Sequence, residues 1–426
     1  MKVCSLRICS ILAMLMVIIV LSGCGGTQAR GADARRAQVV RMFEPETNLV
    51  VKGASEWAHE HPDIYQSFRS NRNNDENYDY VAAYPYLQTL YEGIAFSFSY
   101  NSARGHHWTV EDSEGTGRVK HGGCFQCKSS NFHGLLNTQG VEYDAYAMSF
   151  DEALPLMTET VSCFTCHGNT PGVLIHTNRM VYDALGREIY DMDPKNLACA
   201  QCHNEYFWYP GTRIATLPYN SRAGMHPTAM LEFFNGMFFD GQVFADYVNP
   251  RSGVRQIKIQ HPEIETLLSE GNVHGTHAND AMRFSCSDCH MGSEVNASGV
   301  SFINHFLSSP LNNPRLVEQN CSSCHGDMAA LTKTVRDIQA AVNGRKHPMG
   351  FALAELMEEL VTAVQSGRFT NDQLDPVRMA YRNAQFYFDY VWVENSDGAH
   401  NSRLTHYTLD RAEEWMEQTK TLLGQL

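Results

Sequence analysis

The C-terminal part of the chain carries a strong helical pattern of apolar and polar positions. From about Met328, apolar residues recur at intervals of three and four, which is the spacing of one face of an α-helix. Four stretches show this pattern: 327–342, 350–367, 375–398 and 408–426. Gly344, Gly367 and Gly398 lie near the expected helix ends. We therefore expect long helices whose apolar faces are covered by other parts of the protein.

The N-terminus carries a short apolar run. Lys2 and Arg7 precede the stretch Ile8–Leu21, which is too short and wrongly flanked for a membrane-spanning helix. The run ends in "LSGC", which resembles a bacterial lipoprotein signal, so residues 1–23 would be removed and Cys24 would be lipidated and held at the membrane surface. An ordinary cleaved signal with release into the periplasm, and an uncleaved anchor, are the alternatives. Each version places the protein on the extracytoplasmic side.

These patterns divide the chain into four expected parts. Residues 1–23 are the signal peptide, 24–55 the lipidated cysteine and a flexible tether, 56–327 the region that carries the chemistry, and 328–426 the long-helix region. The 426 residues, 43% of them hydrophobic, can build one large domain or two. The formal charge of −14 argues against a nucleic-acid partner, and no Gly-rich phosphate loop or dinucleotide fingerprint stands out.

Cysteine spacing carries the chemical signal. Ten of the thirteen cysteines form five Cys-x-x-Cys pairs, and the other three lie at the N-terminus, so none is left for an ordinary disulfide framework. The pairs are Cys124/Cys127, Cys163/Cys166, Cys199/Cys202, Cys286/Cys289 and Cys321/Cys324. Four pairs are followed at once by a histidine: His167, His203, His290 and His325. The first pair is followed by Lys128 instead.

Cys-x-x-Cys-His is the attachment motif of c-type haem. The cysteines bond the two vinyl groups of the porphyrin, and the adjacent histidine binds the iron from below. A single pair could be redox-active, and two could hold zinc or an iron–sulfur cluster, but four with an adjacent histidine favour haem. The first pair is most simply a fifth haem site with Lys128 as proximal ligand. The alternative is that its ligand comes from elsewhere, such as His121 or His133.

The remaining histidines offer ligands for the second face of each haem. A haem used only for electron transfer is normally capped on both faces, so four such haems need four more histidines among the nineteen in the chain. The candidates are His106, His274, His305 and His400. The first site differs, because a lysine amine has a pKa of about 10.4 and binds metal only when deprotonated. A catalytic haem with an open face is where such a donor would be useful, because it changes the electronics of the iron.

Four such motifs behind one Cys-x-x-Cys-Lys resemble the pentahaem cytochrome c nitrite reductases, which form ammonia. The resemblance runs from about Tyr84 to the C-terminus. It implies a mainly α multihaem cytochrome fold with little sheet, a haem-filled core and long C-terminal helices that form a homodimer interface. It also implies five covalently bound haem c groups and a membrane-bound multihaem quinol dehydrogenase as electron donor.

The resemblance implies a catalytic site on the open face of the Lys128 haem. Tyr206 stands in "CHNEYFW", His261 in "IKIQHPE", and Arg118 twelve residues after His106 of "ARGHHW", each matching a family motif. The segments around Tyr206 and His261 both lie between the third and fourth cysteine pairs. Those two pairs are 87 residues apart, whereas the other successive pairs are 39, 36 and 35 residues apart. Core packing for Tyr206 and a simple polar role for His261 are the alternatives.

The same two sequences imply one calcium ion beside the haem. Its ligands would be Glu205, the Tyr206 carbonyl, the Lys258 carbonyl and Gln260. Carboxylate, amide and carbonyl oxygens are hard donors, which suit calcium better than softer metals.

The distal histidines also carry over from the family. His106 would cap the third haem, His274 the fifth, His305 the second and His400 the fourth. His107 and His277 stand close to two of these and are alternative ligands.

The implied reaction is the six-electron reduction of nitrite to ammonium. A small anion that approaches a net-acidic protein needs a local positive field, which ferric haem, Arg118, protonated His261 and calcium would provide. His261 is expected to titrate near neutrality and so to donate protons. Reduction of hydroxylamine, nitric oxide or sulfite is the alternative activity. An electron carrier in which every iron is capped is the alternative outside enzymes.

Overall fold

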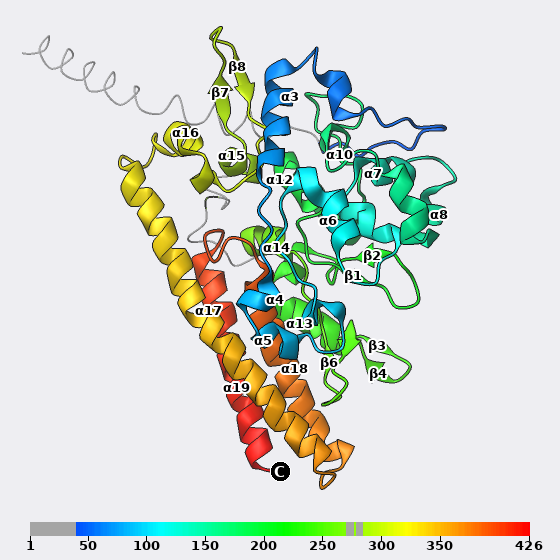
Figure 1. The fold of residues 1–426 in the computed structure, drawn as a ribbon, viewed down its shortest axis with the longest axis vertical. Helices are drawn as coiled ribbons and strands as arrows, with labels where there is room; N and C mark the ends of the chain where they lie inside the picture. The colour runs from blue at the N-terminus through cyan, green and yellow to red at the C-terminus, as the bar shows by residue number, and fades with distance from the viewer. Residues whose placement is uncertain (1–39, 270–276, 278–283) are drawn as a thin grey trace, which may run out of the picture. The chain divides into compact units, whose positions relative to one another are not determined.

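The predicted C-terminal helices are the largest elements of the computed structural model, which describes residues 40–269, 277 and 284–426. They are α17 (Met328–Gln365), α18 (Asn371–Val393) and α19 (Ser402–Gly424), and they pack side by side (Figure 1). The first two predicted stretches are one helix, because α17 continues through Pro348. Gly344, expected near a helix end, therefore lies inside α17.

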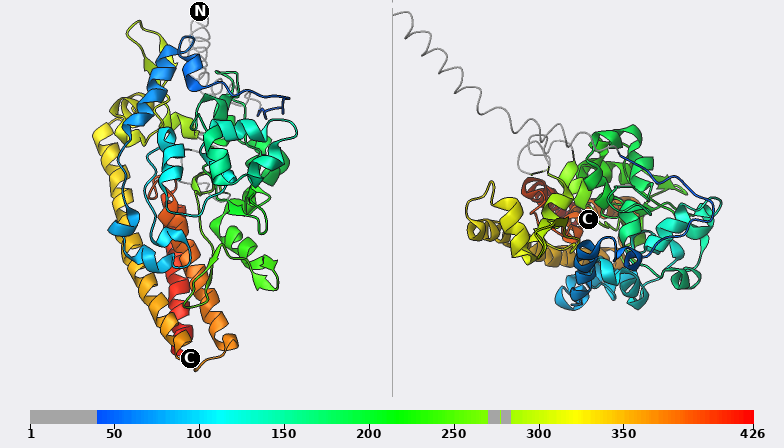
Figure 2. Two further views of the ribbon diagram at one scale, coloured as in Figure 1. Left: turned by 45° about the vertical axis from the view of Figure 1, so that its right-hand side comes forward. Right: turned by 90° about the horizontal axis from the view of Figure 1, so that it is seen from above.

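Helix α18 is the centre of this group. Every residue from Ala380 to Val393 is buried, which fits a helix that is apolar on most of its faces. Leu353 of α17 and Phe388 of α18 are fully buried in the core between the helices. The Tyr381 hydroxyl also donates a 3.1 Å hydrogen bond to the Leu353 carbonyl. The burial that the pattern demanded is thus provided by α17, α19 and the segments packed around them (Figure 2).

The rest of the described residues form short helices, turns and small hairpins. The helices are α3 (Pro62–Arg69), α4 (Tyr80–Ala83), α5 (Tyr86–Leu90), α6 (Thr109–Gly115), α7 (Ser130–Leu136), α8 (Glu142–Ala147), α9 (Phe150–Ala153), α10 (Cys163–His167), α11 (Met180–Leu185), α12 (Pro194–Ala200), α13 (Pro227–Gly236), α14 (Glu263–Leu268), α15 (Cys286–His290) and α16 (Pro314–Leu316).

The strands of the described residues form four antiparallel pairs. They are β1–β2 (Phe207–Trp208, Ala215–Thr216), β3–β4 (Phe238–Phe239, Gln242–Val243), β5–β6 (Tyr247–Val248, Arg255–Gln256) and β7–β8 (Ser293–Val295, Ser301–Ile303). A mainly α fold with little sheet and long C-terminal helices is therefore confirmed.

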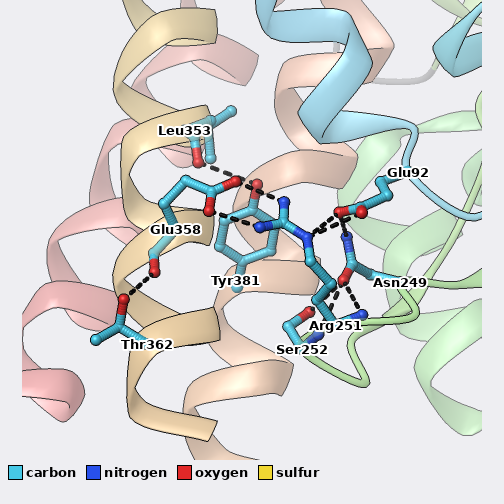
Figure 3. A network of polar contacts seen from close by, with 8 residues as sticks. All are labelled: Glu92, Asn249, Arg251, Ser252, Leu353, Glu358, Thr362 and Tyr381. Carbon is cyan, nitrogen blue, oxygen red and sulfur yellow. Dashed lines mark hydrogen bonds and ion pairs between the residues drawn. The ribbon is translucent and has the colours of Figure 1, made fainter. Parts of the chain in front are cut away.

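A polar network ties the long helices to the hairpin segments (Figure 3). Arg251, in the turn between β5 and β6, donates to the Glu92 carboxylate at 2.7 and 2.8 Å and to Glu358 of α17 at 2.5 and 2.7 Å. Asn249 donates to the same Glu92 carboxylate at 3.2 Å. One guanidinium thus holds two carboxylates from distant parts of the sequence, and it fixes α17 against the region that contains the site.

Residues 41–55 belong to the folded unit, although the sequence analysis assigned them to the tether. Met42 forms a backbone bridge with His176, and Glu46 forms one with Thr138. The Phe43 side chain is buried, and its ring centre lies 5.4 Å from that of Phe164. The apolar ring and the strand-like hydrogen bonds attach this segment to the fold.

Across the described residues, no helix combines the length and apolarity that a membrane crossing requires.

Candidate functional site

Each cysteine pair sits on or beside a short helical turn. Two pairs lie in the one-turn helices α10 and α15, each ending at its histidine, and the first lies in the 3₁₀ turn Gly122–Cys127. The third pair spans the end of α12, and the fifth begins at the last residue of the turn Val317–Cys321. A helical turn brings positions i and i+3 to one face, so both thiols of a pair can reach one flat group. All ten of these cysteines are free thiols.

Cys324, the second cysteine of the fifth pair, departs from the other nine. They are half-buried, as thiols that attach an enclosed haem should be, whereas Cys324 is exposed. The physical reason is its position in a surface turn, where the preceding residues Ser322 and Ser323 are exposed as well. The Ser323 hydroxyl donates to its Sγ at 3.8 Å. Haem attachment at Cys324 stays a prediction from the motif.

Thiols of different pairs lie next to one another. Cys127 is hydrogen-bonded to Cys202, and Cys199 to Cys286, so the third pair adjoins both the first and the fourth. The thiols of Cys166 and Cys199 lie close enough to interact electrostatically. Cys289 lies similarly close to Cys321 of the fifth pair. The five pairs therefore form one connected series in which the third is the branch point.

Four pairs of histidine rings lie with their centres about 6 Å apart. The distances between ring centres are 6.3 Å for His106–His203, 6.4 Å for His167–His305, 6.0 Å for His277–His325 and 6.0 Å for His290–His400. A metal–imidazole bond is about 2 Å long and the ring centre lies about 1 Å behind its nitrogen, so two imidazoles on opposite sides of one metal have centres roughly 6 Å apart. The ring pairs thus fit the width of one six-coordinate haem iron.

Four of these rings make a hydrogen bond through Nδ1 that fixes their orientation. The Nδ1 atoms of His167, His290 and His305 are hydrogen-bonded to backbone carbonyls at 2.8–2.9 Å. The Nδ1 atom of His400 meets the Glu394 carboxylate at 2.6 Å. Such a contact holds the proton on Nδ1 and leaves Nε2 free to bind a metal. The sequence carried no signal for Glu394, which only the fold brings to this ring.

At the fifth site the structure describes only the alternative distal residue, His277. His274, the predicted partner of His325, lies outside the described residues. His277 is described, and it is the ring that faces His325. The two histidines of "NVHGTH" gave no basis in sequence for choosing the second.

Lys128 directly follows the turn of the first cysteine pair, and Thr109 Oγ1 donates to its carbonyl at 2.6 Å. The alternative ligand His133 is fully engaged, because Nδ1 is bonded to Thr177 Oγ1 and Nε2 to the Gln126 carbonyl, both at 2.6 Å. No ring nitrogen of His133 is left for a metal. The ring of His121, the other alternative, packs edge-on against Trp208 with centres 4.5 Å apart.

Arg118 lies beside the first pair. Its guanidinium carbon lies 4.2 Å from the centre of the Phe96 ring, and its Nε donates to Thr116 Oγ1 at 2.8 Å. Burial lowers the pKa of Arg118, while the nearby Tyr206 hydroxyl and Cys124 thiol act in the opposite direction. Arg118 and Tyr206 therefore meet at the first pair, although 88 residues separate them in the chain. Phe96, which supports the guanidinium, was not anticipated from the sequence.

His261 joins the same cluster. Its ring centre lies 6.3 Å from that of His203, and its charge interacts with those of Lys128 and Glu263. Its Nδ1 atom is buried and has no hydrogen-bond partner among the described residues. Burial lowers the pKa of His261 to about 4, whereas the sequence analysis expected titration near neutrality. The enclosed ring is thus neutral at pH 7.

The expected calcium ligands converge. Glu205 is fully buried; its Oε2 accepts from the Gln260 backbone N–H at 2.7 Å, and its Oε1 has no partner among the described residues. The Gln260 side chain donates to the Lys258 carbonyl at 3.2 Å. Burial raises the pKa of Glu205 well above its usual value, because the carboxylate is removed from water. A buried carboxylate beside free oxygen donors fits a hard cation.

This donor set is mostly carbonyl and amide oxygen. Among the residues that the structure describes, no group of three or more His, Cys, Asp or Glu side chains converges as a metal site. That finding agrees with the expected set, which contains one carboxylate and in which two of the four donors are backbone carbonyls.

Solved structures resemble this fold. The catalytic subunit of cytochrome c nitrite reductase from Desulfovibrio desulfuricans, described with two calcium sites, superposes with a TM-score of 0.75 at 24% sequence identity, over 88% of this chain and 86% of that chain. The outer cell wall cytochrome OcwA gives 0.39 at 20% identity, over 73% of this chain and 48% of its own. An undecahaem S-layer cytochrome of Carboxydothermus ferrireducens gives 0.38 at 16% identity, over 77% and 43%.

The sequence itself matches a family over most of its length. The model of the cytochrome c552 family covers residues 53–426, which include all five cysteine pairs and the cluster around Lys128. The chain therefore belongs to the cytochrome c552 family, the family of the cytochrome c nitrite reductases, and is an oxidoreductase.

Proposed function

We propose that this protein reduces nitrite to ammonium with six electrons at a haem ligated by Lys128, fed by four haems that are each held between two histidines. The observation that carries the proposal is the contrast between sites. Four sites bring two imidazole rings together with their centres 6.0–6.4 Å apart. At the first site, polar side chains suited to an anion gather instead: Arg118, Tyr206 and His261.

When bound, the Lys128 haem supplies an iron with one open position and a route for electrons. The Lys128 amine must be neutral to serve as ligand. Arg118 holds the nitrite anion, because guanidinium stays charged at any working pH and its donors fork toward two oxygens. Its contact with the Phe96 ring keeps the guanidinium in place.

Tyr206 and His261 direct and exchange protons. Burial raises the pKa of Tyr206 well above its usual value, so its hydroxyl keeps its proton and donates a hydrogen bond to a bound oxygen. His261, with a pKa of about 4, is neutral at working pH and donates through one ring N–H. A neutral imidazole can take up a proton at its free nitrogen as it gives up the proton on the other nitrogen, so no imidazolate forms and the ring acts as a shuttle rather than as a fixed positive charge.

A calcium ion would be held by Glu205, Gln260 and the carbonyls of Tyr206 and Lys258. Its charge would compensate the buried Glu205 carboxylate and would fix the two segments that carry Tyr206 and His261 relative to each other. Its role is thus to position the site rather than to bind substrate.

The thiol contacts suggest the order of electron transfer. The third haem would pass electrons to the first, since Cys202 touches Cys127, and would receive them from the second and the fourth. We propose His106, His305, His277 and His400 as distal ligands of the third, second, fifth and fourth haems. The fifth haem, attached through Cys321 and the exposed Cys324, would then lie nearest to solvent and would accept electrons from outside.

The remaining parts of the proposal rest on the sequence. Lipidation at Cys24 would hold the protein at the outer face of a membrane, a membrane-bound multihaem quinol dehydrogenase would supply electrons, and the long C-terminal helices would form a homodimer interface.

A dye-coupled assay tests the function. Purified holoprotein with a chemically reduced viologen should consume nitrite and release ammonium in a one-to-one ratio. Hydroxylamine, nitric oxide and sulfite in the same assay rank the alternative substrates. Absence of ammonium from nitrite, with all five haems present, would overturn the proposal.

A further inference from the structure

A continuous group of oxidisable rings leads away from the site. Its members are Tyr78, Tyr80, Tyr84, Tyr86, Tyr100 and Trp392, and we call it the aromatic chain. It joins the segment around α4 and α5 to the end of α18. The nitrite chemistry proposed above makes no use of these rings.

The inner end of the aromatic chain lies at the site. Tyr100 packs 4.9 Å from Phe96, on which the Arg118 guanidinium rests. The Lys258 ammonium lies 5.5 Å from the centre of the Tyr100 ring, and Tyr100 is close enough to Arg118 to affect its pKa. A ring that can lose an electron therefore adjoins the residues that face the open haem.

Two routes run outward from Tyr100. One passes through Tyr80, 5.3 Å away, to Tyr78, a further 5.6 Å away. The other passes through Trp392, to which Tyr100 is hydrogen-bonded, and then through Tyr84 at 5.1 Å, which lies 6.4 Å from Tyr78. Tyr78 is 49% exposed, so both routes end at solvent. The ring-centre distances of these steps lie within the range of direct aromatic contact, about 4.5–7 Å, and the step from Tyr100 to Trp392 is a hydrogen bond.

Two tyrosines that adjoin the routes, Tyr86 and Tyr91, have a hydrogen-bonded base. A tyrosine gives up an electron readily only if its phenol proton has an acceptor at hydrogen-bond distance. The Tyr86 hydroxyl lies 3.0 Å from His347 Nδ1, and Trp392 lies 5.7 Å from the Tyr86 ring. Beside Tyr100, the Tyr91 hydroxyl donates to the Asp389 carboxylate at 2.9 Å. Both distances are within reach of proton transfer.

We propose that the aromatic chain is a hole relay that carries oxidising equivalents from the open haem to Tyr78. The oxidant is a peroxide that reaches the haem when the haems hold no electrons. Two phenols and one hydrogen peroxide give two phenoxyl radicals and two waters, because each ring supplies one electron and one proton. The radicals migrate outward to Tyr78, where a soluble one-electron reductant restores the phenol. The relay rests on the open Lys128 haem of the proposed function and protects it from self-oxidation.

Trapping at Tyr78 tests the relay. Fully oxidised holoprotein is mixed with hydrogen peroxide and a nitroso spin trap, and mass spectrometry locates the adduct. We expect an adduct on Tyr78 in the unaltered protein and in the control Tyr190→Phe, which removes an exposed tyrosine outside the aromatic chain. Tyr100→Phe and the double variant Tyr80→Phe/Tyr84→Phe keep every ring but cut both routes, and they should lose the Tyr78 adduct. Both should also lose nitrite-reducing activity faster than the control after peroxide exposure.

Contrary outcomes are separable from those of the nitrite assay. An adduct that is absent from the unaltered protein while nitrite is still reduced overturns the relay alone, as does an adduct that persists undiminished in both variants. A Tyr78 adduct in a protein that reduces no nitrite supports the relay and overturns the proposed function.

Discussion

Lys128 is the residue on which the distinction between catalysis and electron transfer rests. It occupies the position that a histidine holds in the other four motifs. The structure removes one competitor, because both nitrogens of His133 are hydrogen-bonded within the protein. The Lys128 amine is then the metal ligand that the first motif itself offers.

Replacement of Lys128 by histidine tests this donor. We expect Lys128→His to keep all five haems, because the cysteines that attach them are unchanged, and to lower nitrite turnover about tenfold or more, equal to about 1.4 kcal/mol of transition-state stabilisation. Haem content by absorbance and turnover with a reduced dye provide the measurement. An unaltered turnover number would remove the lysine from the mechanism.

Glu205 is the residue that tests the calcium site. Glu205→Gln keeps the size of the side chain and removes its charge, so we expect calcium affinity to fall by about tenfold or more. Nitrite turnover should fall with calcium occupancy and should recover partly at high calcium concentration. Calcium per protein chain is measured by mass spectrometry. Glu232→Gln on the exposed face of α13 is the matched control, and equal calcium content in both variants would contradict the assignment.

The buried side chain of His133 should make the free energy of unfolding depend on pH. Burial lowers its pKa to about 4 in the folded protein, below its ordinary value near 6.5. The unfolded chain therefore takes up a proton first as the pH falls, and the stabilisation is complete above about pH 6.5 and lost toward pH 4. Between pH 7 and pH 5 this residue should account for about 2 kcal/mol of lost stability.

Denaturant unfolding of His133→Gln at the two pH values measures that loss. The variant should be less stable than the unaltered protein at pH 7, and the difference should shrink at pH 5. Exposed His59→Gln serves as control. A difference that stays constant between pH 5 and pH 7 would show that His133 does not titrate as its burial implies.

At the scale of elements, the long helices were the most predictable part of the fold. Their apolar spacing identified α18 and α19 and both halves of α17. The join within α17 was missed, because glycine and proline usually end helices, while burial of Leu353, Leu356 and Leu360 holds this helix together through Pro348. Two-residue strands such as Phe207–Trp208 leave no periodic signal, because alternation cannot be seen over so short a length.

Packing of α17 on α18 should be essential to stability. Leu353→Ala removes a fully buried side chain and leaves a cavity, so we expect a loss of about 2–5 kcal/mol in the free energy of unfolding. Glu359→Ala, on the exposed side of the same helix, should change it by less than about 0.5 kcal/mol. Denaturant midpoints measure both, and similar values for the two variants would contradict the assigned core.

At the scale of the whole molecule, the site is an assembly of distant segments. Cysteine spacing alone predicts five haem attachments, because that chemistry is local in sequence, but it could not show that Cys324 is exposed while the other nine thiols are half-buried. The cluster of Arg118, Tyr206 and His261 could be placed only by resemblance, since it depends on how three separate segments fold together. The low pKa of His261 and the support of Arg118 by Phe96 are consequences of burial, which no local pattern encodes.

The order of the haems also belongs to the whole molecule. The third cysteine pair touches the first and the fourth, although the sequence places the first and third pairs 75 residues apart. If each pair holds a haem as proposed, this series would let electrons from any of the other four haems reach the first through the third. This arrangement is what a six-electron reaction needs, since no single haem stores more than one electron.

Electron paramagnetic resonance of the oxidised holoprotein, recorded with and without nitrite, tests the account most directly. We expect four low-spin irons, each held between two imidazoles, and one iron with a high-spin signal that changes when nitrite binds. Five low-spin irons that do not respond to nitrite would contradict an open Lys128 site and would leave a protein that only transfers electrons.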